Sequence, residues 1–502
     1  MGKTKGPGST ANRNILGITY LVAALFLGLA VYMGYFLLVK SEDVINNSYN
    51  NARLDSLADR VVRGRILAAD GTVLAETQIN WVSAGEDGDG QAAEGTSGQS
   101  GENGRWQETR VYWHGGVFDH VLGYSTKGKT GIESLANYYL LSSHVNLAEQ
   151  VTNELEGQRN PGDDVITTLD MELQQAAYSA LGDRRGAVIV MEPDTGKILA
   201  MVSKPGYDPN YLLRDWDSMT AEENNQGQLL NRATQGLYPP GSTFKIVTAL
   251  EYIREHPDSY RDYQFDCDGV YEKDDYTIKC YHSTAHGGQD FIRAFANSCN
   301  GAFAGLGLEL DLTGFKATAE GLLFNSDLPL TGVPYKQSTF NMKPGAGVWE
   351  ILQTSIGQGT TQITPLHNCL ITAAIANGGT LMKPYFLEAV QNAAGEEIKR
   401  FLPSAYGNLM TAEEAKALTE LMTAVVTEGT GSALRTDAYT AAAKTGSAEF
   451  EKGKETHAWF TGFAPAESPE IVVTVVVEEG GSGGKAAAPI ARQLFDIYLG
   501  KE

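Results

Sequence analysis

The segment "GAVIVMEPDTGKILAMVS", residues 186–203, consists of two apolar runs on either side of a short polar stretch. Proline, aspartate and glycine in Pro193-Asp194-Thr195-Gly196 favour a tight turn, so we predict a β-hairpin. Near the other end of the chain, "HAWFTGFAP" (457–465) and "EIVVTVVVEE" (470–479) predict two further strands before a terminal helix around 486–498. Strands at both ends of a largely helical middle predict an α+β fold, an antiparallel sheet flanked by helices.

The domain that contains these strands starts near a change of composition at residues 157–183. Residues 165–168 predict a strand, and Asp170 is placed to cap a following helix. We assign residues 161–502 to this domain. Upstream, "VVRGRILAADGTVLAET" (61–77) predicts a hairpin around Asp70-Gly71 in a separate β-containing module, residues 40–160. Its Gly-, Ser- and Glu-rich insertion, residues 82–104, has little to bury.

The N-terminal region contains an uncharged apolar run, residues 15–39, long enough to span a bilayer as one helix. A cleaved signal peptide is the alternative, but its apolar core would be shorter. Lys3, Lys5 and Arg13 lie in the short tail, residues 1–14, that precedes the run. The positive-inside rule therefore predicts a cytoplasmic N-terminus and an extracytoplasmic remainder in a single-pass membrane protein.

Charge and cysteine usage exclude some partners. The formal charge of -22 argues against binding to nucleic acid, which needs clustered Lys and Arg. The four cysteines, Cys267, Cys280, Cys299 and Cys369, are too few and too scattered for a disulfide scaffold. Cys267 and Cys280 are close enough in sequence to pair outside the membrane, but free thiols remain equally open. No CxxC or His-rich spacing indicates a metal site.

The first candidate for chemistry is "PPGSTFK", residues 239–245, in which Ser242 precedes Lys245 by three residues. If Ser242 opens a helix, both side chains share a face and Lys245 Nζ reaches Ser242 Oγ. A serine needs such a base to act as a nucleophile. Taken alone the pattern is weak, because a capping serine followed by a surface lysine is common.

Two further stretches strengthen that candidate. "FANSCNGAF" contains Ser298-Cys299-Asn300, and "AAAKTGSAEF" contains Lys444-Thr445-Gly446 followed by Ser447. SxxK, SxN and KTG in this order are a signature of serine acyltransferases that react with penicillin. The chain resembles the class B, monofunctional penicillin-binding proteins, and the resemblance extends over residues 63–76, 120–133, 231–245, 355–367 and 422–449.

The resemblance implies the penicillin-binding transpeptidase fold, preceded by a pedestal or dimerisation-type module and one transmembrane helix. It implies a peptidoglycan D,D-transpeptidase whose Ser242 attacks the D-Ala-D-Ala end of a stem peptide and then passes the acyl group to an acceptor amine. In the family's roles, Lys245 is the base, Ser298 relays a proton and Asn300 holds the substrate amide. Lys444 keeps the site electropositive, and the hydroxyls of Thr445 and Ser447 bind the substrate carboxylate.

Backbone chemistry agrees with this assignment. Gly446 lets a substrate backbone approach the strand closely, and the N–H groups of Ser242 and Ser447 form an expected oxyanion hole. Acyl transfer on serine needs no cofactor and no metal. His457 and Glu449 are expected to be strand residues, Glu449 a solvated one. Neither His286 nor Cys299 is assigned a chemical role.

Alternatives of two kinds remain. A D,D-carboxypeptidase would hand the acyl group to water, and a β-lactamase would need a deacylating glutamate that we do not identify. A division or elongation scaffold is the alternative outside the enzymes. The resemblance also implies β-lactam antibiotics as inhibitors and a SEDS-type membrane glycosyltransferase as partner. It leaves open whether the role is in division, elongation or sporulation.

Overall fold

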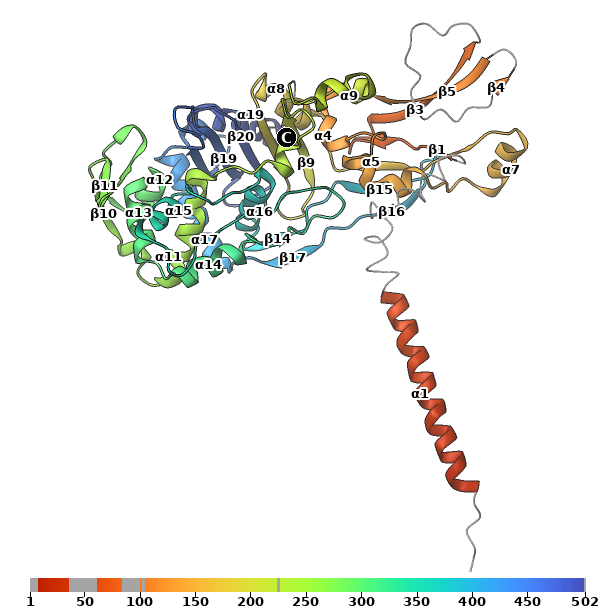
Figure 1. The fold of residues 1–502 in the computed structure, drawn as a ribbon, viewed down its shortest axis with the longest axis horizontal. Helices are drawn as coiled ribbons and strands as arrows, with labels where there is room; N and C mark the ends of the chain where they lie inside the picture. Colours follow the sequence, from red (N-terminus) through yellow and green to blue (C-terminus); the bar gives the residue numbers. More distant parts are fainter. Residues whose placement is uncertain (1–7, 36–60, 84–99, 102–103, 224–225, 501–502) are drawn as a thin grey trace, which may run out of the picture.

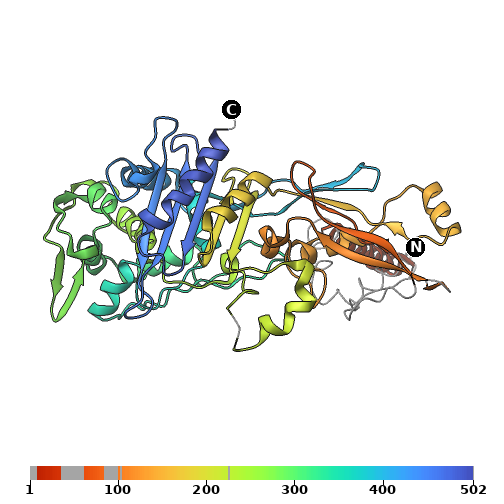
Figure 2. The same ribbon diagram turned by 90° about the horizontal axis from the view of Figure 1, so that it is seen from above.

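The computed structural model describes residues 8–35, 61–83, 100–101, 104–223 and 226–500. The start of the predicted tail, the end of the predicted span and most of the predicted insertion (84–99 and 102–103) lie outside the described residues. The described body has a β-rich end, a central sheet and a helical end (Figures 1 and 2).

The central sheet has five strands, all antiparallel, in the order β18-β19-β20-β8-β9. They are β18 (Ala442–Ala448), β19 (His457–Ala464), β20 (Ile471–Val477), β8 (Gly186–Met191) and β9 (Ile198–Lys204). The predicted hairpin of residues 186–203 is β8 and β9, and both strands predicted near the C-terminus are confirmed. Strands from the start and the end of the segment 161–502 therefore build one sheet, with β18 at its edge.

Both faces of this sheet are covered by helices. Helices α8 (Met171–Leu181) and α19 (Ala488–Leu499) pack on one face, and α16 (Pro365–Ala376) packs on the other. In β20, Val473 and Val475 belong to the cluster on the α19 side, whereas Val472 and Val476 face the other core. A strand buried on both sides has no face in water, which explains why β20 is apolar except for Thr474, whose hydroxyl is hydrogen-bonded to that of Thr461.

The capping prediction for α8 is also confirmed. Asp170 Oδ1 accepts a hydrogen bond of 2.8 Å from the backbone N–H of Leu173. This bond satisfies one of the free N–H groups at the start of the helix.

A helical lobe lies beside the β18 edge. Its helices are α11 (Lys245–Glu255), α12 (Phe291–Ala296), α13 (Asn300–Glu309), α14 (Leu312–Gly321), α15 (Val348–Ser355) and α17 (Ala412–Thr427). Two small antiparallel ribbons border it: β10 (Gln264–Cys267) pairs with β13 (Gly287–Asp290), and β11 (Val270–Lys273) pairs with β12 (Tyr276–Lys279). Phe244 packs against the rings of Phe315, Phe324 and Phe340, and this aromatic cluster holds the start of α11 in the lobe.

A second, mixed sheet of seven strands has the order β16-β15-β7-β2-β3-β5-β4. Its strands are β2 (Ile66–Leu67), β3 (Val73–Ser83), β4 (Ser100–Gly101), β5 (Gly104–Tyr112), β7 (Asp164–Thr167), β15 (Leu387–Gln391) and β16 (Glu397–Arg400). The predicted hairpin at Asp70-Gly71 joins β2 to β3, with Gly71 at φ 86°. Strands from both sides of the expected boundary at residue 160 share this sheet, so the two parts are joined by backbone hydrogen bonds.

Shorter elements lie at the β-rich end, around the central sheet and in the connections between them. They are β1 (Val61–Val62), β6 (Asn160–Pro161), α4 (Asp119–Leu122), α5 (Gly131–Leu135), α6 (Asn137–Leu140), α7 (Leu147–Leu155), α9 (Leu212–Thr220), α10 (Arg232–Gln235), β14 (Thr380–Met382), β17 (Ala405–Asn408) and α18 (Gly483–Ala486).

The N-terminal helix α1 (Gly8–Tyr35) is separate from the body in Figure 1. Its segment Leu16–Tyr35 has a mean hydropathy of 2.1, and none of it is buried. Apolar side chains such as Leu21 and Phe26 are exposed along it. Its length and composition fit a membrane anchor, as predicted.

A buried ion cluster stabilises the β-rich end. Glu133 is fully buried, and its carboxylate accepts hydrogen bonds from Arg63 Nε at 2.7 Å and Arg110 Nε at 2.8 Å. Tyr112 OH donates to the same carboxylate at 3.2 Å. Burial raises the pKa of Glu133, but the charges of Arg110 and Arg63 outweigh it and lower the pKa to about 2.

We predict that Glu133→Gln destabilises the protein by about 3–5 kcal/mol, because it leaves two arginines buried without a counter-charge. Because the pKa of Glu133 is depressed in the folded protein, its stabilisation is present above the ordinary carboxyl pKa and is lost as pH falls toward about 2. Urea unfolding of both proteins measures the difference. The control is Glu397→Gln, which removes an exposed ion pair with Arg400 and should leave the urea midpoint unchanged. Equal urea midpoints for the wild type and both variants would contradict the prediction.

Candidate active site

The turn that carries Ser242 is a 3-10 helix, η5 (Gly241–Phe244), followed directly by α11. The predicted helix therefore begins as a tighter turn, with α-helix only from Lys245. Gly241 has φ 52°, and its N–H donates to the carbonyl of Gly357 at 2.9 Å. A Cβ on Gly357, at φ 76°, would lie 2.0 Å from Gly241 O. The serine turn and the loop of Gly357 thus pack backbone against backbone, which only glycine permits.

Hydrogen bonds from β19 and α16, and one within the turn, hold the serine turn in place. Trp459 Nε1 in β19 donates to Pro239 O at 3.0 Å. Thr243 Oγ1 donates to Pro240 O at 2.8 Å and accepts from Asn368 Nδ2 of α16 at 3.3 Å. Ser242 is therefore presented by a rigid turn between the sheet and the helical lobe.

Lys245 is completely buried. Its Nζ donates to Ser298 O at 2.6 Å, to Asn300 Oδ1 at 2.7 Å and to Ser298 Oγ at 3.2 Å. Within the described residues no hydrogen bond joins Lys245 to Ser242, so the direct pair expected from the three-residue spacing is replaced by bonds to the SxN segment. The carbonyl and amide oxygens of that segment are fixed acceptors at the start of α13, and they hold the ammonium group.

Burial lowers the pKa of Lys245 to about 8. A lysine in water stays protonated well above this value. A useful fraction of Lys245 is therefore neutral near physiological pH, as a general base requires.

Lys444 is also completely buried, in β18. Its Nζ donates to Ser298 Oγ at 2.9 Å and to Thr445 O at 3.1 Å. Burial, and then the neighbouring charge of Lys245, hold its pKa well below the usual lysine value. Ser298 Oγ thus lies between two lysine amines, in hydrogen-bond contact with both.

The KTG segment lies in β18, the edge strand of the central sheet. Thr445 Oγ1 donates to Thr430 Oγ1 at 2.7 Å. A Cβ on Gly446 would lie 3.2 Å from Trp459 Cβ and 3.3 Å from the backbone nitrogen of Thr243. The missing side chain therefore lets β18 lie close to the serine turn. Because β18 ends the sheet, its outer edge has no strand partner among the described residues.

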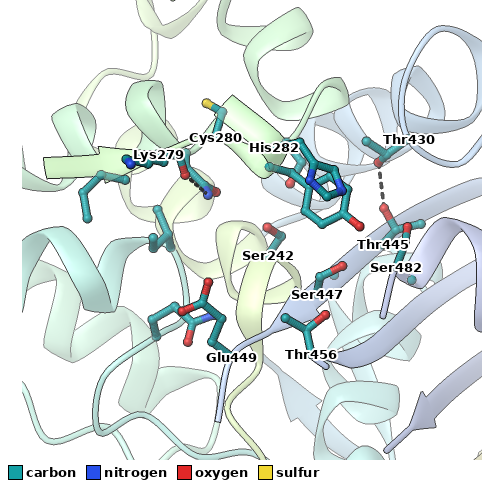
Figure 3. A pocket seen from close by; sticks show the side chains of 18 of the residues that line it. Ser242, Lys279, Cys280, His282, Thr430, Thr445, Ser447, Glu449, Thr456 and Ser482 are labelled. Atoms are coloured by element: carbon teal, nitrogen blue, oxygen red, sulfur yellow. Dashed lines mark hydrogen bonds between the residues drawn. The ribbon is translucent and has the colours of Figure 1, made fainter. Parts of the chain in front are cut away.

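These segments open onto one cavity of about 630 Å³. Its lining includes Ser242, Ser298, Asn300, Thr445 and Ser447. Figure 3 shows Ser242 and Ser447 facing the same space, with Thr445 bonded to Thr430 at one side and Glu449 at the other. Six of the eight predicted site residues line this cavity, Gly446 among them. Lys245 and Lys444 are buried behind it, and each donates a hydrogen bond to Ser298, which does line it.

Some residues at this cavity were not predicted from the sequence. Thr430, in the stretch 422–449 but outside the KTG triplet, was assigned no role, yet it is hydrogen-bonded to Thr445. Glu449 is exposed, as predicted, but it lies just beyond the end of β18 at Ala448 and lines the cavity. His457 is a buried β19 residue stacked on Phe450, which confirms the strand prediction.

The surroundings of Cys299 were also not predicted. The ligand atoms of Cys267, Cys280, His286 and Cys299 all lie within 4.8 Å of one another. Cys267 and Cys280 are free thiols with their sulfurs 3.7 Å apart, so they form no disulfide in this structure. The sequence showed no metal-like spacing because the four residues come from separate ribbons and a helix start.

Known proteins resemble this chain over most of its length. Residues 186–496 match the model of the penicillin binding protein transpeptidase domain. The chain is 33% identical to the peptidoglycan D,D-transpeptidase PbpA of Mycolicibacterium smegmatis, over 79% of this chain and 85% of that protein.

Solved structures agree with this match. The ceftriaxone acyl-enzyme complex of penicillin-binding protein A from M. tuberculosis is 28% identical, with a TM-score of 0.75 over 89% of this chain and 100% of that one. The D,D-transpeptidase domain of a peptidoglycan glycosyltransferase from Eggerthella lenta is 30% identical, with a TM-score of 0.73 over 88% of this chain and 99% of that one.

Proposed function

Because the chain belongs to the penicillin-binding protein transpeptidase family, we propose that it is a membrane-anchored peptidoglycan D,D-transpeptidase that cross-links stem peptides through an acyl-enzyme on Ser242. The observation that carries this proposal is the hydrogen bonding of Ser298 Oγ to both Lys245 and Lys444 beside the Ser242 cavity. Three segments far apart in sequence meet there, each with the residue type that serine acyl transfer needs.

The donor stem peptide binds along the outer edge of β18. An extended peptide can add to an edge strand through main-chain hydrogen bonds, and Gly446 leaves room for it. The hydroxyls of Thr445 and Ser447 then bind the terminal carboxylate of D-Ala-D-Ala, with the Lys444 side chain close by. To donate to the carboxylate, the Thr445 hydroxyl turns its proton away from Thr430 Oγ1, which accepts it in this structure.

Acylation begins with neutral Lys245, which accepts the Ser242 hydroxyl proton as Oγ attacks the carbonyl of the penultimate D-alanine. The N–H groups of Ser242 and Ser447 stabilise the oxyanion. Collapse of this intermediate breaks the peptide C–N bond, and the departing amine takes a proton relayed through Ser298 Oγ. An ester on Ser242 and free D-alanine result, and Asn300 holds Lys245 in place throughout.

Transfer reverses these proton movements. The acceptor amine attacks the ester carbonyl and loses a proton to Lys245, and the Ser242 oxygen leaves and regains its proton. The product is the cross-linking amide. A β-lactam enters the same path as an inhibitor: its ring amide opens onto Ser242, but the amine stays attached to the acyl group and blocks the acceptor.

We predict that a fluorescent penicillin labels the purified protein covalently and that Ser242→Ala abolishes the label, because no other group replaces the nucleophile. Gel fluorescence measures the label, and Ser259→Ala, an exposed serine outside the cavity, is the control. Incubation of the wild type with a stem-peptide donor and an acceptor should give a cross-linked product. Hydrolysed donor alone would favour a carboxypeptidase, and no labelling by any β-lactam would favour a scaffold.

The depressed pKa of Lys245 predicts a pH dependence. A base works in its neutral form, which is populated above the pKa, so the penicillin acylation rate should rise with pH and level off above about 8. Below that pH the rate should fall about tenfold per unit.

Stopped-flow labelling over this pH range measures the rate. Lys245→Arg keeps a positive charge but cannot lose its proton, so acylation should fall by about 10²-fold or more across the range. An acylation rate independent of pH in the wild type would contradict Lys245 as the base.

We further propose the domain division expected from the sequence: a cytoplasmic tail (1–14), an anchor (15–39), a pedestal (40–160) and the transpeptidase domain (161–502). The exposed apolar surface of Leu16–Tyr35 supports the anchor, and the basic residues before it support a cytoplasmic N-terminus. Protease added to intact spheroplasts should then digest the transpeptidase domain, and full protection of that domain would refute this topology.

We also propose a SEDS-type membrane glycosyltransferase as partner, on the basis of the family resemblance. Helix α1 supplies a long apolar surface, not buried over Leu16–Tyr35, for contact within the membrane. Replacing residues 15–39 with an unrelated membrane span should abolish co-purification with that partner, while penicillin labelling should continue. Unchanged co-purification would remove the anchor from the interface.

A further inference from the structure

Glu449 is a carboxylate at the catalytic cavity to which the proposed transpeptidation assigns no role. It lies directly after Ala448, the last residue of β18, and its side chain is exposed. Figure 3 shows its carboxylate pointing into the cavity on the side opposite Thr445. A charged group in this place can act on whatever part of the substrate lies beside it.

The carboxylate of Glu449 belongs to no ion pair within the part of the chain that the structure describes. Neighbouring carboxylates are paired. Glu451 forms an ion pair with Lys454. Glu478, which lines an adjoining cavity, forms one with Arg185. The negative charge of Glu449 is therefore left for a ligand.

The position of Glu449 follows from the geometry of β18. Side chains two residues apart in a strand lie on the same face, about 7 Å from one another. Thr445, Ser447 and Glu449 therefore form one row, and all three line the catalytic cavity. A donor peptide that runs antiparallel to β18, with its carboxylate at the first two residues, has its preceding residues at the third. Glu449 thus lies beside the stem residue that precedes D-Ala-D-Ala.

Gln358 fixes the backbone of Glu449 and limits where the donor can pair. With its side-chain amide oriented so that both polar atoms are satisfied, Gln358 Nε2 donates to Glu449 O at 3.1 Å, and its Oε1 accepts from Glu449 N at 3.2 Å. These main-chain groups are therefore closed to an added strand. The donor leaves the strand edge at this point and meets Glu449 through a side chain.

Space for the rest of the stem peptide adjoins this point. A second cavity of about 990 Å³ shares Gln353, Gln358, Glu449 and Thr456 with the catalytic cavity. The two cavities therefore meet at Glu449. A stem peptide that leaves the edge of β18 continues from the first cavity into the second.

The proposed function also implies a cation on the donor. The acceptor stem attacks through an amine, and donor and acceptor are copies of the same stem, so a donor that is not yet cross-linked carries the same amine. A primary amine is protonated at neutral pH. Cross-linking or acylation converts it into a neutral amide. A carboxylate without an ion-pair partner distinguishes these two forms by charge.

On the basis of that proposed function, we propose that Glu449 is a specificity-determining residue that binds a side-chain ammonium on the donor residue preceding D-Ala-D-Ala. A diamino acid carries such an amine, on a flexible side chain that reaches a neighbouring carboxylate. The site then favours donor stems whose own amine is free over donor stems already cross-linked through it.

The test compares three peptides, each an N-acetylated residue followed by D-Ala-D-Ala. That residue is lysine, Nε-acetyl-lysine or norleucine, so the charge is removed with and without added bulk. Each peptide competes with fluorescent penicillin for the full-length protein in detergent. The lysine peptide should halve the labelling rate at about threefold to fivefold lower concentration than the other two, as expected for one exposed ion pair. This preference should shrink as salt is added.

The variants are compared by the ratio between the lysine and acetyl-lysine peptides within each protein, so a general loss of labelling cancels. Glu449→Gln should remove the preference for the lysine peptide, and Glu449→Lys should reverse it. The control is Glu470→Gln, which removes an exposed carboxylate outside both cavities and should keep the wild-type ratio.

Two results would overturn the role of Glu449 and leave the proposed function standing. One is equal competition by the three peptides, or competition by none, in a wild type that penicillin labels. The other is a preference that Glu449→Gln retains. If a Glu449 variant fails to fold, the three peptides and their salt dependence in the wild type still decide. A wild type that no penicillin labels is the separate result that defeats the proposed function itself.

Discussion

The buried hydrogen bonds of Lys245 are the interaction on which the candidate site depends. An ammonium group without water must be bonded on all sides, and here Ser298 and Asn300 supply the acceptors. Those acceptors lie in a segment more than fifty residues away in sequence. The helical lobe, the SxN segment and the KTG strand must therefore pack correctly before Lys245 acquires a lowered pKa.

The same requirement explains the rigidity around the serine turn. Glycines at positions 241, 357 and 446 let three backbone segments approach more closely than side chains would allow. The indole of Trp459 adds a hydrogen bond from the sheet. Tight packing of this kind positions a nucleophile to within fractions of an ångström, which acyl transfer requires. At the other end of the molecule, the seven-stranded sheet joins the β-rich end to the rest through β7 and β15.

Much of this arrangement could be predicted locally. The hairpins at Asp70-Gly71 and Pro193–Gly196 follow from turn residues, and the α8 cap follows from Asp170. These predictions succeed because neighbouring residues determine them. The pairing of β15 with β7 could not be predicted, because the strands are more than two hundred residues apart and the local sequence of a strand does not specify its partner. For the same reason the clustering of side chains around Cys299 was not predicted, because their spacing in the sequence matches no short metal motif.

The sequence by itself determined the residue types of the site, because SxxK, SxN and KTG each bring a fixed chemistry, and it determined the sheet-forming ends and the apolar N-terminal helix. Only the tertiary structure decided how those residues are connected. In the structure Lys245 is hydrogen-bonded to Ser298 and Asn300 and not to Ser242, and Ser298 lies between two lysines. Three cysteines and a histidine lie close together beside them. Such contacts depend on distances in space, which the folding of remote segments sets.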